Sequence, residues 1–468
     1  MINDIDLVIT ELSQLIDKSK IIVDAEALKP YGSDHTEDFC FPPNVVVKPE
    51  TTAEVSAIMQ WAYAHEIPVI PIGARTGLSG GILATQGGVG LSLERMNEII
   101  HIDKNNLQVI TQPGVITEVL QNAVAQEGLF YPVDPASKGS CFIGGNVAEN
   151  AGGARAVKYG VTKDYVLNLE VVLPNGEIIW TGVNTLKNAT GYNLTQLMVG
   201  SEGTLGVITK IVLKLIPQQK LTNLLLVPFL QIDEATTAVA EIFKAGVVPS
   251  AMEFMEMEAI RWTTKFMEAP ELNLLPETEA LLLIEIDGND AEVMFAEAEK
   301  LMEILTRFSI GEVIFAETEE HKNTIWKMRR NISEAVKIHS VYKEVDTVVP
   351  RYELTKLLKS VKEIGDKYGF KSVCYGHAGD GNLHVNIVKD NMSDEQWKNV
   401  VPKGVKEIFE LTVQLGGTLS GEHGIGWVQR NFMSIAFSPI QLELMKGIKK
   451  LFDPKNIMNP GKIFPDNH

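Results

Sequence analysis

The stretch Pro71-Ile-Gly-Ala-Arg-Thr-Gly-Leu-Ser-Gly-Gly81 decides the fold of this chain. It continues an apolar run at 69–72 that predicts a strand, and four of its eleven residues are glycine. Glycine permits positive φ angles and lets a ligand approach the backbone closely. Successive N–H groups of such a loop can surround a pyrophosphate, and Arg75, Thr76 and Ser79 would add donors. The glycine spacing matches neither G-x-G-x-x-G nor the Walker A loop, so the loop alone is equally consistent with a surface turn.

Two later segments share this crowding of small residues and polar amides. They read Asp134-Pro-Ala-Ser-Lys-Gly-Ser-Cys-Phe-Ile-Gly-Gly-Asn-Val-Ala-Glu-Asn-Ala-Gly-Gly153 and Val199-Gly-Ser-Glu-Gly-Thr-Leu-Gly-Val-Ile208. Three such segments are hard to explain as unrelated turns. We expect them to line one long cleft that fits an extended dinucleotide with a polar end and a flat ring system.

The surrounding pattern predicts an α/β or α+β domain over residues 1–216. Residues 43–49 predict a short strand closed by proline, and 51–65 predict a helix that Thr51 or Thr52 would cap. Residues 206–216 alternate like a strand. Helix and strand signals alternate between these segments, as they do in domains that mix the two elements.

A second α+β unit is predicted for residues 217–412, after a linker at 217–221. Its expected strands are 224–227, 280–286 and 311–315, and its expected helices are 233–245, 290–307 and 318–337. Residues 413–468 return to glycine-rich loops and a closing helix. We expect this last segment to rejoin the first domain.

Composition excludes several classes of protein. The chain has 468 residues and a formal charge of −18, which argues against a nucleic-acid surface. Its three cysteines form no C-x-x-C pair, which predicts a cytoplasmic protein without a disulfide framework or a four-cysteine iron–sulfur cluster. The start at Met1 lacks the pattern of a signal peptide, and no apolar run approaches the ~18–20 residues of a membrane span.

Two glycine-rich segments near the C-terminus hold three of the nine histidines. In Tyr375-Gly-His-Ala-Gly-Asp-Gly-Asn-Leu-His-Val-Asn386, a central turn signal predicts that flanking strands bring His377 and His384 together. In Gly416-Gly-Thr-Leu-Ser-Gly-Glu-His-Gly-Ile-Gly426, Glu422 could complete a His-His-Glu set for zinc or a similar ion, leaving His423 as a base. The alternatives are unrelated histidines, or a zinc hydrolase that would leave the glycine segments without a purpose.

The three glycine segments resemble the FAD-binding domain of the vanillyl-alcohol oxidase and p-cresol methylhydroxylase type. The motifs G-H-A-G-D-G-N-L-H-V-N and S-G-E-H-G-I-G narrow the resemblance to the branch with the glycolate oxidase flavin subunit, D-lactate dehydrogenases and D-2-hydroxyglutarate dehydrogenase. The resemblance covers nearly the whole chain. It implies an α+β fold with two α+β subdomains that cradle FAD and an α+β cap domain over the isoalloxazine. Because no histidine lies between residues 66 and 100, we expect FAD to be bound non-covalently.

The resemblance also implies site residues. His377, His384 and Glu422 would bind a divalent metal, with zinc favoured and iron or manganese as alternatives, and His423 would be the general base. Arg329, Ser333, Lys343 and Asn386 would bind the substrate, although Ser333 stands where the hydroxyglutarate enzymes carry threonine. The FAD-binding set would be Pro71, Ile72, Gly73, Ala74, Arg75, Thr76, Gly77, Ser79, Gly80, Gly81, Pro132, Asp134, Ser140, Gly144, Gly145, Asn146, Ala148, Asn150, Gly153, Gly203, Gly206, Val207, Ile208 and Asn459.

The implied reaction is oxidation of a small 2-hydroxy acid, with D-lactate or glycolate favoured, to the 2-oxo acid by hydride transfer to flavin N5. Electrons would then pass to an electron-transfer flavoprotein or an iron–sulfur subunit. Two alternatives stay open: a non-catalytic flavin subunit that only shuttles electrons, and an FAD enzyme of the same fold that acts on another alcohol. The sequence leaves the oligomeric state open.

Overall fold

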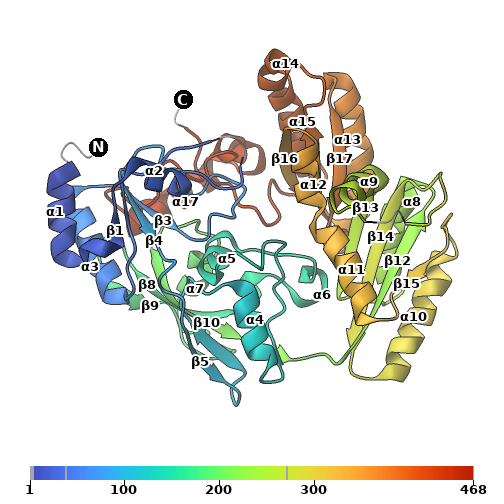
Figure 1. Cartoon of the computed structure of the whole chain (residues 1–468), viewed down its shortest axis with the longest axis horizontal. Helices are drawn as coiled ribbons and strands as arrows, with labels where there is room; N and C mark the ends of the chain where they lie inside the picture. The colour runs from blue at the N-terminus through green and yellow to red at the C-terminus, as the bar shows by residue number, and fades with distance from the viewer. Residues whose placement is uncertain (1–4, 37–38, 270–271, 467–468) are drawn as a thin grey trace. The chain divides into compact units, whose positions relative to one another are not determined.

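The computed structural model describes residues 5–36, 39–269 and 272–466. The N-terminal segment lacks the sequence pattern of a signal peptide. Residues 1–4 of that segment lie outside the described residues. The backbone forms two compact units. Unit 1 comprises Met1–Ala151, Val161–Gln218 and Glu422–His468, and unit 2 comprises Gly152–Gly160 and Gln219–Gly421. Each unit has its own sheets and helices, which confirms the expected α+β class (Figure 1).

The first sheet of unit 1 places the glycine loop at a strand end. Its strand order is β1 (Ile21–Ile22), β2 (Val45–Val47), β4 (Val89–Ser92) and β3 (Val69–Ile72), and β4 runs parallel to both β2 and β3. Helix α3 (Thr52–His65) buries Val55, Ile58 and Met59 in the same core as the strand valines. The Thr51 side chain accepts a hydrogen bond from the Glu54 N–H, which confirms the predicted N-cap. The loop at 73–81 begins where β3 ends.

The second sheet of unit 1 is antiparallel. Its order is β5 (Ile99–Asp103), β6 (Gln108–Thr111), β10 (Val207–Lys214), β8 (Val166–Val172) and β9 (Ile178–Trp180). Helices α4 (Thr117–Ala125), α5 (Ile143–Glu149) and α7 (Leu194–Met198) contribute buried apolar residues to its core. The alternation of 206–216 therefore correctly indicated a strand, because β10 is a central strand of this sheet.

The C-terminal part of unit 1 packs against β3. After helix α17 (Pro439–Phe452), the Val69 N–H donates to the Ile457 carbonyl at 2.7 Å, and the Asn459 N–H donates to the Val69 carbonyl at 2.8 Å. Residues far apart in sequence are thus joined at the strand that leads into the glycine loop.

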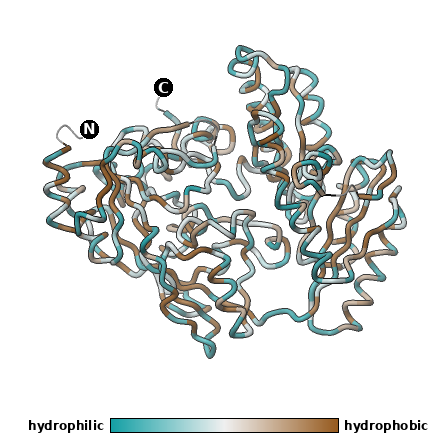
Figure 2. The backbone as a smooth tube through the Cα atoms, viewed as in Figure 1, coloured by the Kyte–Doolittle hydropathy of each residue, from teal (hydrophilic) through white to brown (hydrophobic). Residues whose placement is uncertain are grey.

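Unit 2 is built on one seven-stranded antiparallel sheet. The strand order is β15 (Ile314–Phe315), β12 (Leu221–Phe229), β14 (Ala280–Gly288), β13 (Ala251–Glu256), β17 (Lys371–Gly376), β18 (Asn382–Val388) and β16 (Tyr342–Val348). Helices α9 (Met257–Phe266), α11 (Glu319–Arg330) and α12 (Ile332–His339) share a core with Leu281 and Leu283 of β14. Helices α8 (Ile232–Lys244), α10 (Ala291–Leu305), α13 (Leu354–Tyr368), α14 (Asp394–Asn399) and α15 (Val401–Gln414) complete the unit. In Figure 2 the hydrophobic colouring runs along the strands of this sheet.

Three sequence-based boundaries in unit 2 were wrong. The helix predicted at 318–337 is two helices, α11 and α12, because Asn331 ends the first one with φ −89° and ψ 2°. The Asn331 side chain donates to the Lys327 carbonyl at 2.7 Å, which closes that end locally. The strand predicted at 311–315 is limited to Ile314–Phe315. The predicted linker at 217–221 begins in β11 (Ile216–Pro217), which pairs with β7 (Leu129–Phe130), and ends in β12.

Within the described ranges, no helix combines the length and the apolar character that crossing a membrane requires.

Candidate functional site

The three glycine-rich segments come together inside unit 1. A Cβ built on Gly73 would lie 3.8 Å from the Cα of Gly145, and a Cβ on Gly145 would meet nothing within 4 Å. A Cβ on Gly203, whose φ is +66°, would lie 3.2 Å from the Pro71 side chain. Segments from 71–81, 134–153 and 199–208 therefore adjoin, and Gly145 faces open space of the kind that a bound group needs.

Asn459 connects two of these segments. Its Nδ2 donates to the carbonyls of Gly81 and Glu202, each at 2.9 Å. Its Oδ1 and the Ser79 hydroxyl are both buried, and neither has a hydrogen-bond partner within the described part of the chain. Buried polar atoms are normally satisfied, so these two orphan atoms mark a place where a polar ligand fits.

Several of the predicted FAD-binding side chains are engaged by the protein itself. The Arg75 guanidinium lies 4.8 Å from the centre of the Tyr31 ring, and Asn146 Nδ2 donates to Thr117 Oγ1 at 2.7 Å. Ser140 donates to the Ser137 carbonyl, Asn150 accepts from the Lys163 N–H, and Asp134 forms an ion pair with Lys138 at 2.8 Å. These side chains therefore stabilise the segments themselves.

The other predicted FAD-binding residues lie on the same loops and strand ends. Pro132 follows β7, Gly144 and Ala148 lie in α5, and Gly206 stands immediately before Val207 and Ile208 of β10. Gly153 is the exception, because the segment 152–160 is assigned to unit 2.

The histidine motif of unit 2 forms the expected hairpin. Strands β17 and β18 are antiparallel, with Tyr375 opposite His384. The rings of His377 and His384 are 5.4 Å apart between centroids. Asp380 accepts a hydrogen bond from the Asn382 N–H at 3.2 Å, so Asp380 is part of the turn. The side chains of both histidines are buried, and their ring nitrogens are atoms that can bind a metal ion.

Glu253 of β13, a residue that the sequence did not single out, lies behind His377. Its carboxylate is 2.8 Å from His377 Nδ1, and it accepts hydrogen bonds from Nε and NH2 of Arg329 at 2.7 and 2.6 Å. Burial raises the pKa of Glu253, but the charges of His377 and Arg329 outweigh burial and hold that pKa below its ordinary value. With Nδ1 facing a carboxylate, the His377 Nε2 is the atom that is left for a metal.

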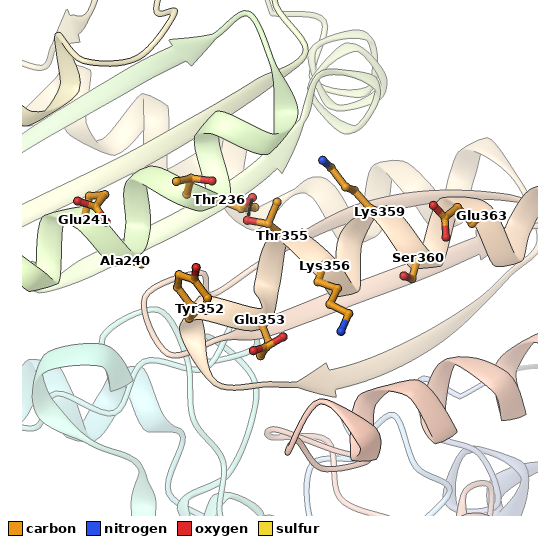
Figure 3. A pocket seen from close by; sticks show the side chains of 11 residues that line it. Thr236, Ala240, Glu241, Tyr352, Glu353, Thr355, Lys356, Lys359, Ser360 and Glu363 are labelled. Atoms are coloured by element: carbon orange, nitrogen blue, oxygen red, sulfur yellow. Dashed lines mark hydrogen bonds between the residues drawn. The ribbon is translucent and has the colours of Figure 1, made fainter.

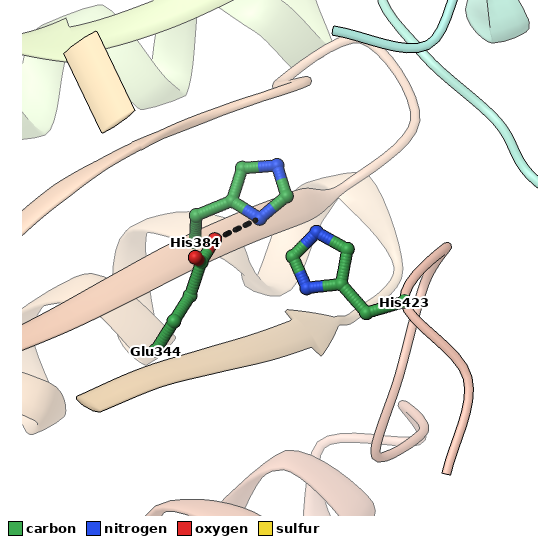
Figure 4. Close-up of side chains that lie close together, drawn as sticks. All are labelled: Glu344, His384 and His423. Atoms are coloured by element: carbon green, nitrogen blue, oxygen red, sulfur yellow. Dashed lines mark ion pairs between the residues drawn. The ribbon is translucent and has the colours of Figure 1, made fainter. Parts of the chain in front are cut away.

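His384 has an equivalent carboxylate neighbour. Its Nδ1 forms an ion pair with Glu344 of β16 at 3.2 Å, as Figure 4 shows, and lies 3.7 Å from Asp346. Figure 4 also shows the side chain of His423, which is two residues after Gly421 in the sequence. Each metal-ligand histidine of the predicted set therefore has an acidic group beside one ring nitrogen, an arrangement that fixes ring orientation and tautomer.

Asp346 anchors the segment that leads to Glu422 and His423. Its carboxylate accepts hydrogen bonds from Asn382 Nδ2 at 2.6 Å and from Ser420 Oγ and the Gly421 N–H, each at 2.8 Å. The Thr418 N–H donates to the Val348 carbonyl at 2.9 Å. Asp346 lies opposite His384 in the sheet, so Gly421, the residue before Glu422, is fixed to the strand pair that carries His384.

The predicted substrate-binding residues fall into two groups. Asn386 lies opposite Glu344 on the strand face that also carries His384. Its amide is buried, and neither of its polar atoms makes a hydrogen bond of normal geometry within the described residues. Arg329 joins His377 through Glu253, and Ser333 lies half-buried in the first turn of α12.

Lys343 is not brought together with these side chains. Successive residues of a strand point to opposite faces, so Lys343 and Glu344 of β16 face opposite ways. The Lys343 ammonium lies 5.7 Å from the centre of the Trp397 ring of α14. The strand alternation therefore separates Lys343 from the face that holds His384 and Asn386.

A surface pocket in unit 2 is a separate feature. It encloses about 470 Å³ between α8 and the start of α13, and Thr236, Tyr352, Lys356 and Glu363 are among its lining residues (Figure 3). None of the predicted site residues lines it.

Comparison with known proteins identifies the family. Residues 43–182 match the FAD binding domain family, and residues 218–463 match the family of the C-terminal domain of FAD linked oxidases. The chain is 39% identical over 435 residues to glycolate oxidase subunit GlcD of Bacillus subtilis (strain 168), covering 93% of this chain and 92% of that protein. It is 38% identical over 463 residues to a D-lactate dehydrogenase of Anaerostipes hadrus, covering 96% and 97%.

A solved structure of p-cresol methylhydroxylase shares the fold, with a TM-score of 0.80 at 17% identity over 100% of this chain and 98% of that one. The chain is a member of the FAD-linked oxidase family, an oxidoreductase with an FAD-binding domain, and the resemblance drawn from the sequence motifs is confirmed. The open glycines and the orphan atoms of Ser79 and Asn459 lie within or beside the matched domain and fit FAD.

Proposed function

We propose that this protein oxidises a small 2-hydroxy acid, D-lactate or glycolate in the first instance, to the corresponding 2-oxo acid. The observation that carries the proposal is the buried histidine pair of the β17–β18 hairpin, with carboxylates beside both rings. The proposal is supported by the names of the relatives, a glycolate oxidase subunit and a D-lactate dehydrogenase. FAD would be held without a covalent bond by the glycine segments of unit 1.

We further propose that His377, His384 and Glu422 hold a divalent metal, zinc in the first instance and iron or manganese as alternatives. Imidazole and carboxylate form a donor set that suits such ions, and second carboxylates behind the rings support it. When bound, the metal would act as a Lewis acid that lowers the pKa of the substrate hydroxyl. Glu422 enters the proposal because Asp346 fixes Gly421, and Glu422 is the next residue.

The chain's own residues would orient the acid and remove its proton. Arg329 is buried, and within the described residues its Nε and NH2 atoms contact Glu253. The remaining N–H donors of its guanidinium would bind the substrate carboxylate. Asn386 would contribute its buried amide. His423 would accept the hydroxyl proton as general base. FAD supplies the hydride acceptor when it is bound. Lys343 has less structural support as a substrate-binding residue, because its position on the strand directs its side chain towards Trp397.

The electrons would leave the protein through a partner. The chain has too few cysteines for a four-cysteine cluster of its own. An electron-transfer flavoprotein or an iron–sulfur subunit would accept the electrons.

The proposal is tested by anaerobic reduction of the purified flavoprotein. D- and L-lactate, glycolate and D-2-hydroxyglutarate would be added in turn, and flavin absorbance followed. Bleaching by D-lactate or glycolate is expected, together with release of free flavin after acid denaturation. His423→Asn with FAD retained should bleach far more slowly. If aryl alcohols or sugars bleach the flavin and 2-hydroxy acids do not, the proposed substrate class is wrong; if none does, an electron-shuttle subunit is the better explanation.

A further inference from the structure

The turn that follows His423 is held by one buried carboxylate of unit 1. Glu202 accepts hydrogen bonds from two successive backbone N–H groups, Ile425 to Oε1 at 2.9 Å and Gly426 to Oε2 at 2.6 Å. Each of these hydrogen bonds restrains the backbone of its donor residue, because a hydrogen bond requires a defined distance and angle. Two of them on adjacent residues fix both the position and the orientation of the turn that starts one residue after His423.

Glu202 is itself fixed to the glycine segments. Its φ is +50°, an unusual value for a residue with a side chain, and its N–H donates to the Ala148 carbonyl at 2.9 Å. Its own carbonyl accepts from Asn459 Nδ2, the same amide that binds Gly81. The backbone around Glu202 is therefore part of the proposed FAD site, while its side chain reaches the turn at 424–426.

Two glycines of the turn, Gly424 and Gly426, lie close to neighbouring parts of unit 1. Gly424 has φ +77°, and a Cβ there would overlap Glu149 Oε2. Gly426 has φ +53°, and a Cβ there would overlap the Ser79 carbonyl. The Ser79 carbonyl accepts from the N–H groups of Trp427 and Val428 at 2.9 and 3.1 Å. The turn is thus confined between Ser79 of the first glycine loop and the side chains of Glu202 and Glu149.

The two glutamates have different electrostatic settings. Burial raises the pKa of Glu202 above its ordinary value, although its two backbone donors and the positive charge of Lys462 act in the opposite direction. Glu149 Oε2 is buried without a hydrogen-bond partner in the described part of the chain. Burial first, and then the charges of Glu202 and Asp34, raise the pKa of Glu149 well above its ordinary value. Glu202 therefore receives hydrogen bonds from the turn, whereas Glu149 Oε2 receives none within the described residues.

We propose that Glu202 is a positioning residue that sets the place of His423 relative to the glycine segments of unit 1, by holding the backbone N–H groups of Ile425 and Gly426. This inference rests on the proposed function, because it assigns His423 a catalytic position. Glu202 touches neither substrate nor reacting atoms; it acts through the turn. Glu202 would thereby fix His423, the proposed base, to the same backbone segments that are proposed to bind FAD.

The test compares Glu202→Gln with a matched control, Glu170→Gln, in the FAD-bound protein. Glutamine keeps the shape of Glu202 but presents an NH2 group to one of the two N–H donors, so one bond is lost. Glu170 is also buried in unit 1, where it accepts from Thr52, Thr209 and Lys210, away from the turn. The control therefore reports the general cost of removing a buried carboxylate from this unit.

Two readouts distinguish positioning from a general structural effect. Hydrogen exchange of peptides that cover 422–428 should quicken by about tenfold or more in Glu202→Gln and stay unchanged in Glu170→Gln. Flavin reduction at saturating 2-hydroxy acid should slow by about tenfold or more in Glu202→Gln, with KM nearly unchanged and the flavin content of the wild type. Both results together support the inference.

Three outcomes would overturn it. The first is unchanged exchange of 422–428 in Glu202→Gln, and the second is faster exchange of that peptide with normal flavin reduction. The third is an equal increase in exchange throughout unit 1, which would mean a general loss of stability. Failure of the proposed function is recognised separately, because it appears in the wild type as flavin that no 2-hydroxy acid reduces.

Discussion

Glu253 shows how one buried side chain can contact two residues that are proposed to be functional, Arg329 and His377. A buried ion pair is stable only if each charge is compensated, and Glu253 compensates Arg329 while it orients His377. The sequence around Glu253, Ser250-Ala-Met-Glu-Phe-Met-Glu256, reads as a strand with two acids and gives no indication of which one faces the histidine. Only the pairing of β13 with β17, which sets Phe254 opposite Gly376, places Glu253 beside the start of the hairpin.

Glu253→Gln should lower both metal content and stability. Loss of the carboxylate behind His377 is expected to weaken metal binding by about 10–100-fold, measured by metal analysis after dialysis. Arg329 would be left buried and uncompensated, and the free energy of unfolding should fall by about 3–5 kcal/mol in urea titration. Glu256→Gln, on the same strand but paired with Lys362, is the control and should keep the metal. Equal metal content in both variants would contradict the role of Glu253.

Glu149→Gln should change the pH dependence of stability. The pKa of Glu149 is raised in the folded protein, above an ordinary value of 4.5. The stability that this group contributes is therefore complete below about pH 4.5 and is lost as the pH rises through the raised folded pKa. Glutamine does not titrate, so the Tm of the variant relative to wild type should increase from about pH 5 to about pH 8. Parallel Tm curves over that range would show that Glu149 is ionised in both states.

At the scale of elements, a bridge joins β16 to the segment 416–421 within unit 2, and that segment ends directly before Glu422. Gly417 makes this possible, because a Cβ there would overlap the Val348 carbonyl. The bridge pairs Val348 with Thr418, and Asp346 then holds Ser420 and Gly421. The glycines of this motif thus have a packing reason that is independent of any ligand.

Gly417→Ala should impair catalysis more than cofactor binding. The added methyl forces the bridge apart, which costs about 1–3 kcal/mol and displaces the residues before Glu422. We expect slow flavin reduction by 2-hydroxy acids, a lower metal content and a normal flavin content. Gly447→Ala in α17 is the control, since a Cβ there meets nothing within 4 Å, and alanine favours a helix. Normal reduction by Gly417→Ala would mean that the bridge does not position Glu422 and His423.

Element boundaries show where periodicity succeeds and where it fails. Long patterns were read correctly: the helix at 51–65 and the strand at 206–216 differ little from α3 and β10. The helix at 318–337 was read as one element because its apolar spacing continues across Asn331. The break comes from hydrogen bonds of Asn331 to the preceding turn, a local interaction that hydrophobic periodicity does not register.

At the scale of the whole molecule, the candidate groups divide between the two units. The glycine segments that would hold FAD lie almost entirely in unit 1, which also contains Glu422 and His423. His377, His384, Arg329 and Asn386 belong to unit 2. Because no residue belongs to both the proposed FAD-binding set and the proposed metal-binding set, the cofactor and the metal should be separable by experiment.

Metal removal should abolish the reaction and spare the flavin. After treatment with a chelator and dialysis, flavin absorbance per protein should be unchanged, because no proposed metal ligand lies in the FAD-binding segments. Reduction of the flavin by 2-hydroxy acid should be lost and should return when zinc, iron or manganese is added back. Reduction that persists in protein shown to be metal-free would remove the metal from the mechanism.

The sequence by itself determined the family, the α+β class and the identity of the glycine and histidine segments, because these depend on local composition and spacing. It also suggested Ser79 and Asn459, whose Oγ and Oδ1 atoms have no hydrogen-bond partner in the part of the chain that the structure describes. Tertiary structure alone decided the partners: Glu253 behind His377, Glu202 beneath the turn after His423, and the orientation of Lys343 towards Trp397. Each of these depends on strand pairing or on contacts between residues distant in sequence, and no local pattern encodes which of two neighbouring side chains faces a given site.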